Sequence, residues 1–255
     1  MHKDTAILVE NLSKEYQINI IDIKTFKRDL ISFFKLEKFF DTTEEDKKNS
    51  VLALKGINFE IKKGDIVGLI GENGAGKSTF LKILSGITEP TIGQISYSGK
   101  LIAMLTIGAG LDGNCTAKEN IYFIGSMHGY DKSHIDTKFD EILEFADLVG
   151  FSDTPMKKFS SGMTSRLVFS TVVSFRPDIL VADEILANSD DNFKLKCIDK
   201  LKKLNSEGTT ILFVSHEESL IKNLCTYGIF FEKGKTSEKI EIEKCFNKYK
   251  NYLNF

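Results

Sequence analysis

Apolar residues in this chain form short runs that alternate with stretches of helical spacing. Runs typical of buried strands occupy residues 6–10, 57–61, 65–70, 94–97, 101–105, 179–182, 210–214 and 229–232. Helical spacing fills about 116–175, a stretch that ends before Pro177, and recurs at 191–204. Because strands and helices alternate on both sides of the longer helical stretch, we predict an α/β fold whose parallel-sheet core is interrupted by a helical subdomain.

The loop that follows the predicted strand at 65–70 has the sequence Gly-Glu-Asn-Gly-Ala-Gly-Lys-Ser at 71–78. It matches the phosphate-binding pattern G-x-x-x-x-G-K-[ST], and strand, loop and helix follow in the required order. Glycines let backbone N–H groups close around phosphate oxygens, and the helix N-terminus adds partial positive charge. Lys77 is expected to reach the β- and γ-phosphates, and Ser78 to bind Mg²⁺. This context favours a nucleotide site over a structural turn, with the binding residues Gly71, Asn73, Gly74, Ala75, Gly76, Lys77, Ser78 and Thr79.

Two adjacent acids, Asp183 and Glu184, end the apolar strand that begins at residue 179. This arrangement places Asp183 near Mg²⁺ and leaves Glu184 facing the γ-phosphate, where a carboxylate can polarise the attacking water. Two acids after a strand more often cap a helix, but the phosphate loop upstream favours the catalytic interpretation. His216 comes directly after the apolar strand run at 211–214 and Ser215. It is either an ordinary strand-end residue or a neighbour of the same γ-phosphate.

A serine- and glycine-rich segment lies roughly twenty residues before Asp183 and is followed by Arg166 and an apolar helical pattern. Its sequence is Phe-Ser-Ser-Gly-Met at 159–163, and we refer to these residues as the signature segment. With the phosphate loop, the two acids and the histidine in this order, the chain resembles the ATPase subunits of ABC transporters over nearly all of residues 7–232. The resemblance implies a P-loop NTPase core of the ABC ATPase type with an antiparallel β subdomain.

The same resemblance implies roles for several further residues. Ser160, Ser161 and Gly162 would cap the ATP held by the opposite subunit of a head-to-tail homodimer. Small residues at a helix start can bring backbone N–H groups onto a phosphate, which agrees with this role. Tyr16 would stack on adenine, and Asp190 would lie in the loop that links the two sites. Glu184, His216 and Lys77 would be the catalytic residues, with His216 sensing the γ-phosphate.

The wording of three motifs resembles one branch of the family, the polysaccharide and polyol-phosphate exporters. They are Phe-Ser-Ser-Gly-Met-Thr-Ser-Arg-Leu at 159–167, Asp-Glu-Ile-Leu-Ala-Asn-Ser-Asp at 183–190 and Ile-Gly-Ala-Gly-Leu at 107–111. This branch exports O-antigen, capsule or teichoic acid. The resemblance implies an ATP- and Mg²⁺-dependent subunit that binds a separate transmembrane permease at the cytoplasmic face of the membrane and drives export of a lipid-linked glycan. An exporter for another substrate and a soluble ABC-type ATPase remain the alternatives, and a bare P-loop kinase is disfavoured.

Two positions depart from the pattern of that branch. Ser189 replaces the usual glycine of Ala-Val-Gly-Asp, which costs the loop conformational freedom. Thr106 stands where relatives place glutamine or glutamate near Mg²⁺, and its hydroxyl cannot carry charge. Residues 108–113 also match G-x-G-x-x-G, but Asn114 and Thr116 indicate a turn followed by a helix cap, not a dinucleotide fingerprint.

The domain organisation follows from these elements. An ABC ATPase domain is expected at 1–240, with an insert at about 19–50, a helical subdomain at about 112–176 and a C-terminal helix at 241–255. Within the insert, residues 23–40 place basic residues on one helical face and aromatic residues on the other. This face suits a membrane surface, and packing on the domain is an equal interpretation. In the C-terminal helix, Ile242, Phe246, Tyr249 and Leu253 are spaced to dock on the domain.

Composition narrows the functional class only slightly. With 34 Lys and Arg residues against 36 Asp and Glu, there is no basic excess that would favour nucleic acid. The four cysteines lack metal or disulfide spacing and are expected to be free thiols. No run approaches the roughly 18 apolar residues of a membrane span, and the start lacks a signal-peptide core. A partner subunit would therefore have to supply any membrane span.

Overall fold

The computed structural model describes residues 3–17, 50–105, 111–183 and 190–253, and the structural statements below concern these residues. The predicted insert helix at 23–40, Thr106 and Glu184 lie outside this part of the chain. So does Ser189, the residue that departs from the usual glycine of the exporter branch.

Two sheets organise the molecule. An antiparallel sheet has the order β2-β1-β4 and consists of β1 (Thr5–Gln17), β2 (Ser50–Lys62) and β4 (Ile92–Tyr97). The other sheet has the order β10-β8-β3-β7-β6-β5, with β9 also paired to β8. Its parallel strands are β3 (Ile66–Ile70), β5 (Leu101–Met104), β6 (Ile179–Asp183), β7 (Thr210–Val214) and β8 (Tyr227–Glu232). The short strands β9 (Lys235–Thr236) and β10 (Ile240–Glu241) run antiparallel to β8. The predicted α/β class is confirmed.

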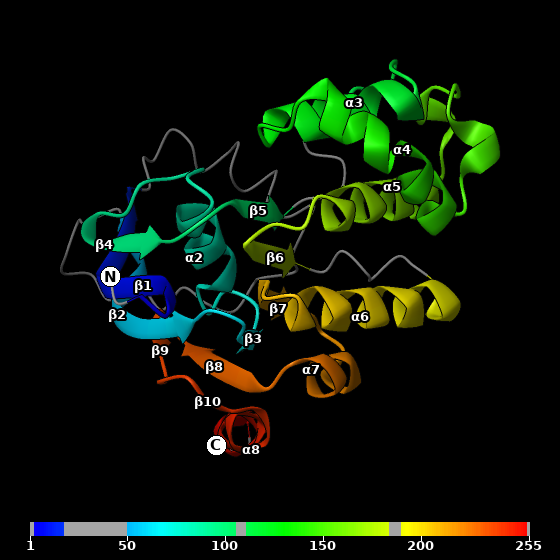
Figure 1. Ribbon diagram of the computed structural model, residues 1–255. Coiled ribbons are helices and arrows are strands. Elements are labelled where there is room, and N and C mark those ends of the chain that lie inside the picture. The colour runs from blue at the N-terminus through cyan, green and yellow to red at the C-terminus, as the bar shows by residue number, and fades with distance from the viewer. Residues whose placement is uncertain (1–2, 18–49, 106–110, 184–189, 254–255) are drawn as a thin grey trace.

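Helices cover the parallel sheet and extend beyond it (Figure 1). They are α2 (Lys77–Leu84), α3 (Ala117–Met127), α4 (Lys132–Ala146), α5 (Ser161–Ser174), α6 (Asp191–Ser206), α7 (Glu218–Leu224) and α8 (Ile242–Leu253), with short 3₁₀ turns at Val149–Phe151 and Met156–Lys158. The predicted cap at Thr116 is confirmed, because its side chain and that of Glu119 form a reciprocal capping box at the start of α3. We refer to α3, α4 and α5 as the helical layer.

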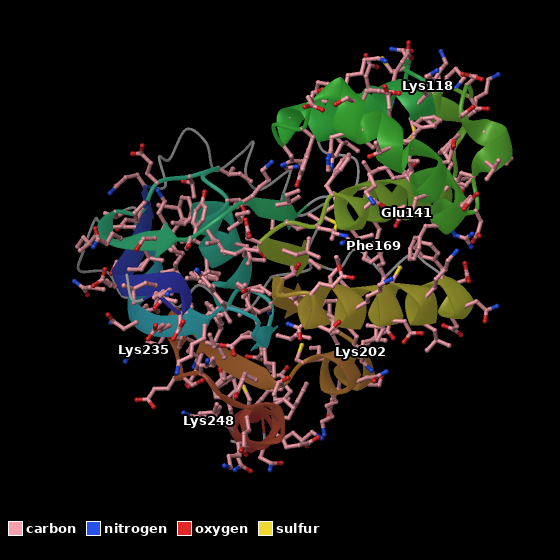
Figure 2. The ribbon with its side chains drawn as sticks, in the orientation of Figure 1. Lys118, Glu141, Phe169, Lys202, Lys235 and Lys248 are labelled. Carbon is pink, nitrogen blue, oxygen red and sulfur yellow. The ribbon has the colours of Figure 1, made fainter. Side chains whose placement is uncertain are left out.

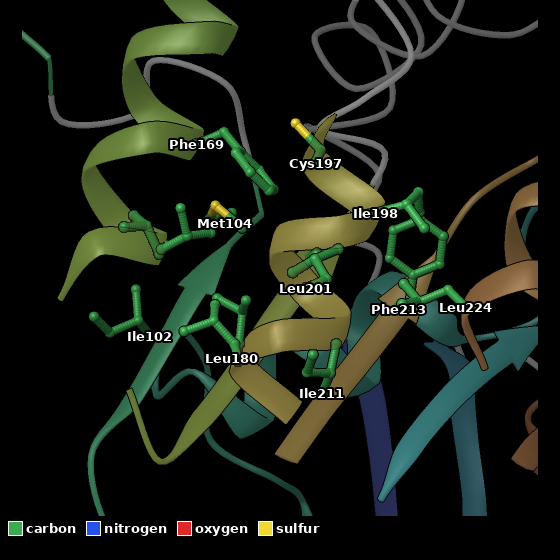
Figure 3. Packing of buried hydrophobic residues seen from close by; sticks show 14 of the residues in the cluster. Ile102, Met104, Phe169, Leu180, Cys197, Ile198, Leu201, Ile211, Phe213 and Leu224 are labelled. Carbon is green, nitrogen blue, oxygen red and sulfur yellow. The ribbon is translucent and has the colours of Figure 1, made fainter. Parts of the chain in front are cut away.

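The parallel strands are buried on both faces, which explains their nearly continuous apolar sequences. In β3, Ile66 and Ile70 belong to a hydrophobic cluster with α3 to α8, whereas Val67 and Leu69 belong to a second cluster with α2, β1 and β2. The alternation follows the period of two in a strand. Helix α2 therefore packs between the two sheets, and Figure 3 shows Leu201 of α6 over the opposite face of the parallel sheet.

The C-terminal helix docks on the core as predicted, but the prediction that Leu253 belongs to its docking face is wrong. Ile242 and Phe246 are buried, whereas Leu253 is 51% exposed. Tyr249 lies against Phe230 as predicted, with the ring centroids 5.7 Å apart, and Tyr252 lies there in place of Leu253, at 5.5 Å. The helix is thus rotated so that Tyr252 takes the position that simple spacing gave to Leu253.

Candidate functional site

The phosphate loop at 71–78 joins β3 directly to α2, which begins at Lys77, within the loop pattern itself. Two of its glycines are required by close backbone approaches. Gly71 has a φ of 152°, and a Cβ there would collide with the carbonyl oxygen of Phe231. Gly76 has a φ of 111°, and a Cβ there would lie 2.8 Å from the carbonyl oxygen of Ala53. A larger residue at either position would push the loop away from β2 and β8.

Lys77 is held by the backbone of its own loop. Its side chain is buried, and Nζ donates to the carbonyl oxygens of Gly71 at 2.6 Å and Glu72 at 2.9 Å. The ammonium charge thus lies within the phosphate loop, next to the N-terminus of α2. Positive charge and helix N–H groups at one place suit an anion such as a triphosphate.

A cavity of about 130 Å³ opens over this loop. Its walls bring together residues from β2, the phosphate loop, α2 and the ends of β6 and β7: Ala53, Glu72, Asn73, Gly74, Gly76, Lys77, Ser78, Thr79, Asp183 and Val214. Asp183 pairs in register with Val214 at the carboxyl ends of their parallel strands. The ends of parallel strands are the usual binding edge of an open α/β sheet.

Ser78 and Asp183, which lie about a hundred residues apart in the sequence, share this cavity. A hydroxyl and a carboxylate are hard oxygen donors, the type that Mg²⁺ prefers. Mg²⁺ commonly takes only one or two protein ligands and completes its shell with water and phosphate oxygens. The residues present therefore fit the predicted metal, although Glu184 next to them lies outside the described part of the chain.

Two of the predicted nucleotide-binding residues shape the loop instead of lining the cavity. Gly71 provides the close approach to β8, and the buried Ala75 accepts a hydrogen bond at 3.0 Å from the N–H of Gly234. Sequence reasoning missed three lining residues. Ala53 comes from a distant strand without a motif, Glu72 occupies a variable position of the pattern, and Val214 only precedes the histidine motif.

His216 and Tyr16 do not line the cavity, but each belongs to a segment adjacent to a residue that does. His216 follows Val214 by two residues, in the connection from β7 to α7. Tyr16 is 37% exposed on β1, opposite Val51 of β2, the strand that also supplies Ala53 to the cavity wall. Their roles in phosphate sensing and adenine stacking stay predictions.

The signature segment lies at the start of α5 in the helical layer, away from the residues that line the cavity. Ser160 caps the helix, and its Oγ accepts the N–H of Met163 at 3.2 Å. Ser160 and Ser161 are exposed. The phosphate loop and the exposed N-terminus of α5 are thus separate elements, and the predicted role of the second in capping a nucleotide stays a prediction.

Arg166, one helical turn into α5, connects the signature helix to α6. It forms ion pairs with Asp147 at 3.3 Å and with Asp190. Asp190 caps α6 by accepting the N–H of Phe193 at 3.0 Å. This N–H and the Arg166 guanidinium hold the pKa of Asp190 below its usual range. The helix that begins in the signature segment and the predicted linking loop thus meet through a charged pair.

Further contacts fasten the helical layer to α6. Lys200 pairs with Glu141 at 3.0 Å, and Lys196 donates to the carbonyl oxygen of Phe145 at 2.8 Å. The rings of Phe145 and Phe193 lie 6.1 Å from Phe169, which is fully buried. Figure 2 shows Phe169 on the side of the helical layer that faces α6. An aromatic centre bordered by ion pairs thus joins the layer to the core.

The four cysteines are unpaired, as predicted. Burial raises the pKa of Cys245 to about 12, so this thiol stays protonated at neutral pH. Among the helices that the structure describes, no helix is long and apolar enough to cross a membrane.

This fold and this site define a P-loop ATPase whose phosphate loop is accompanied by a separate signature helix. Comparison with known families specifies the class: residues 54–187 match the model of the ABC transporter family. The chain belongs to the ATPase subunits of that family.

Curated relatives resemble the chain over most of its length. The teichoic acids export ATP-binding protein TagH of Levilactobacillus brevis is 40% identical over 255 residues, which cover 98% of this chain and 67% of TagH. The O-antigen export system ATP-binding protein RfbB of Klebsiella pneumoniae is 35% identical over 250 residues, covering 98% of this chain and 99% of RfbB. The ABC transporter protein AbcA of Aeromonas salmonicida is 38% identical over 202 residues, and the match spans 66% of AbcA.

Solved structures confirm the fold. An ATP-binding subunit of an ABC transporter superposes with a TM-score of 0.75 at 18% identity, covering 96% of this chain and 94% of the other. The ATP-binding cassette MJ0796, in a dimeric post-hydrolysis state with ADP and Pi, superposes with a TM-score of 0.71 at 21% identity, covering 92% of this chain and 98% of the other.

Proposed function

We propose that this chain is the ATP-hydrolysing subunit of an ABC exporter that moves a lipid-linked polysaccharide of the O-antigen, teichoic acid or capsule type across the cytoplasmic membrane. The observation that carries the proposal is the 35–40% identity, over nearly the whole chain, to export ATP-binding proteins of two polysaccharide systems. The signature wording Ser-Ser-Gly-Met and the cavity over the phosphate loop support it.

Within the site, the chain's own groups divide the work of phosphoryl transfer. The loop backbone and Lys77 bind and orient the triphosphate, and Ser78 and Asp183 would hold Mg²⁺. When bound, Mg²⁺ supplies charge neutralisation to the phosphates. Glu184 accepts a proton from the attacking water, and His216 holds the γ-phosphate in place.

The working unit is a head-to-tail homodimer in which the signature segment of one subunit faces the phosphate loop of the other. The separation of these two elements within one chain supports this arrangement, as does the dimeric state of the cassette MJ0796. A separate transmembrane permease holds the dimer at the cytoplasmic face of the membrane and takes up the lipid-linked glycan.

The function is tested by analysing glycans in cells whose chromosomal copy carries Glu184→Gln. We expect a surface polysaccharide to disappear while its lipid-linked form accumulates at the cytoplasmic side of the membrane, and the accumulated sugar identifies the cargo. If all surface and lipid-linked glycans stay unchanged, the polysaccharide assignment is wrong. Accumulation of a different lipid, drug or peptide would instead establish an exporter for another substrate.

A further inference from the structure

Helix α8 packs on the parallel sheet at positions where the strands carry glycine. Gly68 of β3 and Gly228 of β8 are partners in the strand register. A Cβ on Gly228 would lie 2.8 Å from Cβ of Cys245 in α8. A Cβ on Gly68 would lie 2.8 Å from Cγ2 of Ile221 in α7 and 3.4 Å from Cδ1 of Ile242 in α8. The two glycines form a shallow seat on the strands, in which Gly228 makes room for α8 and Gly68 makes room mainly for α7 beside it.

The last turn of α8 reaches the phosphate loop itself. The hydroxyl of Tyr252 donates to the carboxylate of Glu72 across 3.3 Å. Glu72 lines the nucleotide cavity, and its carbonyl oxygen accepts a hydrogen bond from Lys77 at 2.9 Å. One residue of the loop thus faces α8 with its side chain and the catalytic lysine with its backbone.

A second path joins the same two elements through β8. The ring of Tyr252 packs on Phe230 with the centroids 5.5 Å apart. The next residue, Phe231, presents its carbonyl oxygen to Gly71, the first residue of the phosphate loop. Tyr252 thus contacts Glu72 directly through its hydroxyl, and through its ring it contacts Phe230, the neighbour of the residue that approaches Gly71.

The negative charge of Glu72 makes its hydrogen bond with Tyr252 relevant to nucleotide binding. A carboxylate on the wall of a triphosphate site repels the phosphates, and the repulsion grows as the distance shrinks. The Tyr252 hydroxyl lies outside the cavity lining and draws the carboxylate towards α8. Burial and the Glu72 charge both raise the pKa of Tyr252, so the hydroxyl stays protonated and remains a donor.

We propose that Tyr252 is a positioning residue for nucleotide binding, which holds the Glu72 carboxylate against α8 and away from the triphosphate. The proposal rests on nucleotide binding at the phosphate loop. If Tyr252 has this role, a partner that binds α8 and moves Tyr252 would change the nucleotide affinity of the site.

The test measures the Kd of a slowly hydrolysed ATP analogue, with Mg²⁺, for Tyr252→Phe in the full chain. We expect the Kd to rise about two- to fivefold, the effect of one nearby charge in a solvent-accessible site. In a Glu72→Gln background the same substitution leaves the Kd unchanged, because the repelling charge is gone. The KM for ATP rises with the Kd, while kcat is unaltered.

Tyr249→Phe is the matched control, since Tyr249 lies on the same helix and packs on the same Phe230. Burial and the nearby Glu72 charge raise the pKa of Tyr249 as well, but the hydrogen bond to the Glu72 carboxylate comes from Tyr252, so the pair of variants isolates that bond. An equal Kd for Tyr252→Phe and wild type, or an equal rise in both tyrosine variants, overturns the positioning role. A rise that persists in the Glu72→Gln background overturns it as well. Failure of the wild type to bind the analogue would instead contradict the proposed function.

Discussion

The phosphate loop and the signature segment are both short, rich in small residues and placed at a helix N-terminus, yet the chain holds them differently. The phosphate loop is tied down on several sides: its lysine is buried among its own carbonyl groups, and β2 and β8 approach its glycines. The signature segment has one capping bond and exposed serines. One element is complete within the chain, whereas the other is presented outward. The difference favours a site shared between two copies.

The largest effect is expected from the residue that acts only on the phosphate-loop side. Glu184→Gln should lower the ATPase rate about 10²- to 10⁴-fold, because general-base assistance is lost, and should spare ATP binding. The rate and the Kd for ATP are measured on the same preparation, with Glu207→Gln at the exposed end of α6 as the control. A variant that keeps more than about a tenth of the wild-type rate would remove Glu184 from this role.

The next effect concerns the aromatic centre that joins the helical layer to α6. Phe169→Ala removes a fully buried ring and should cost about 3 to 5 kcal/mol of unfolding free energy, measured by denaturant titration. Phe123→Ala, at a half-exposed position of α3, should change it by about 0.5 kcal/mol or less. Similar losses in both variants would contradict a junction held by Phe169.

A negative charge introduced into the signature segment tests whether this segment acts on the phosphate loop of the opposite subunit. Ser161→Glu should lower the ATPase rate at least about tenfold by repelling the phosphate of the opposite subunit, while ATP affinity of single subunits stays unchanged. The helix itself tolerates the acid, which is favourable in a first turn. Ser133→Glu, in the exposed first turn of α4, should leave the rate unchanged. Weaker binding by single Ser161→Glu subunits would indicate that the segment acts within its own chain.

The smallest effect is a pH dependence of stability at the pair between α5 and α6. The pKa of Asp190 is lowered in the folded state, so its stabilisation is present above the unfolded pKa of about 3.9 and is lost as pH falls through the folded pKa. Asp190→Asn keeps a good helix cap and removes the charge. The variant should be less stable than wild type at pH 7 and equal to it well below pH 4. Asp199→Asn, exposed on the same helix, serves as control, and a difference that persists in strong acid would contradict the charge-based account.

The sequence predicts best where the chemistry is local. The phosphate loop is contiguous, so its residues and their order were enough to place Lys77 and Ser78 where the loop after β3 enters α2. Asp183 followed because the strand that carries it is a strongly apolar run. Contacts that depend on helix rotation were not predictable from spacing. Regular spacing along α8 predicted that Leu253 would dock, but Tyr252 docks instead. The surface on which α8 packs is formed by β3 and β8, which are distant in the sequence, so the rotation of the helix could not be predicted from its own spacing.

Contacts between residues far apart in the sequence could not be predicted either. Arg166 and Asp190 were both singled out, but their ion pair depends on how α5 packs beside α6. Tyr252 and Glu72 are 180 positions apart and carry no motif in common. Ala53 enters the cavity wall only because β2 folds back against the loop. Such contacts are consequences of the packed core, not of any segment read alone.

The shared site is tested most directly by mixing two inactive variants, Lys77→Ala and Ser161→Glu. In a head-to-tail dimer, each mixed pair combines the intact phosphate loop of one subunit with the intact signature segment of the other and so rebuilds one of its two sites. Random exchange then predicts recovery of about a quarter of the wild-type ATPase rate, which neither variant shows alone. If the mixture stays as inactive as its components although mixed dimers form, the signature segment does not act across the dimer and the account is contradicted.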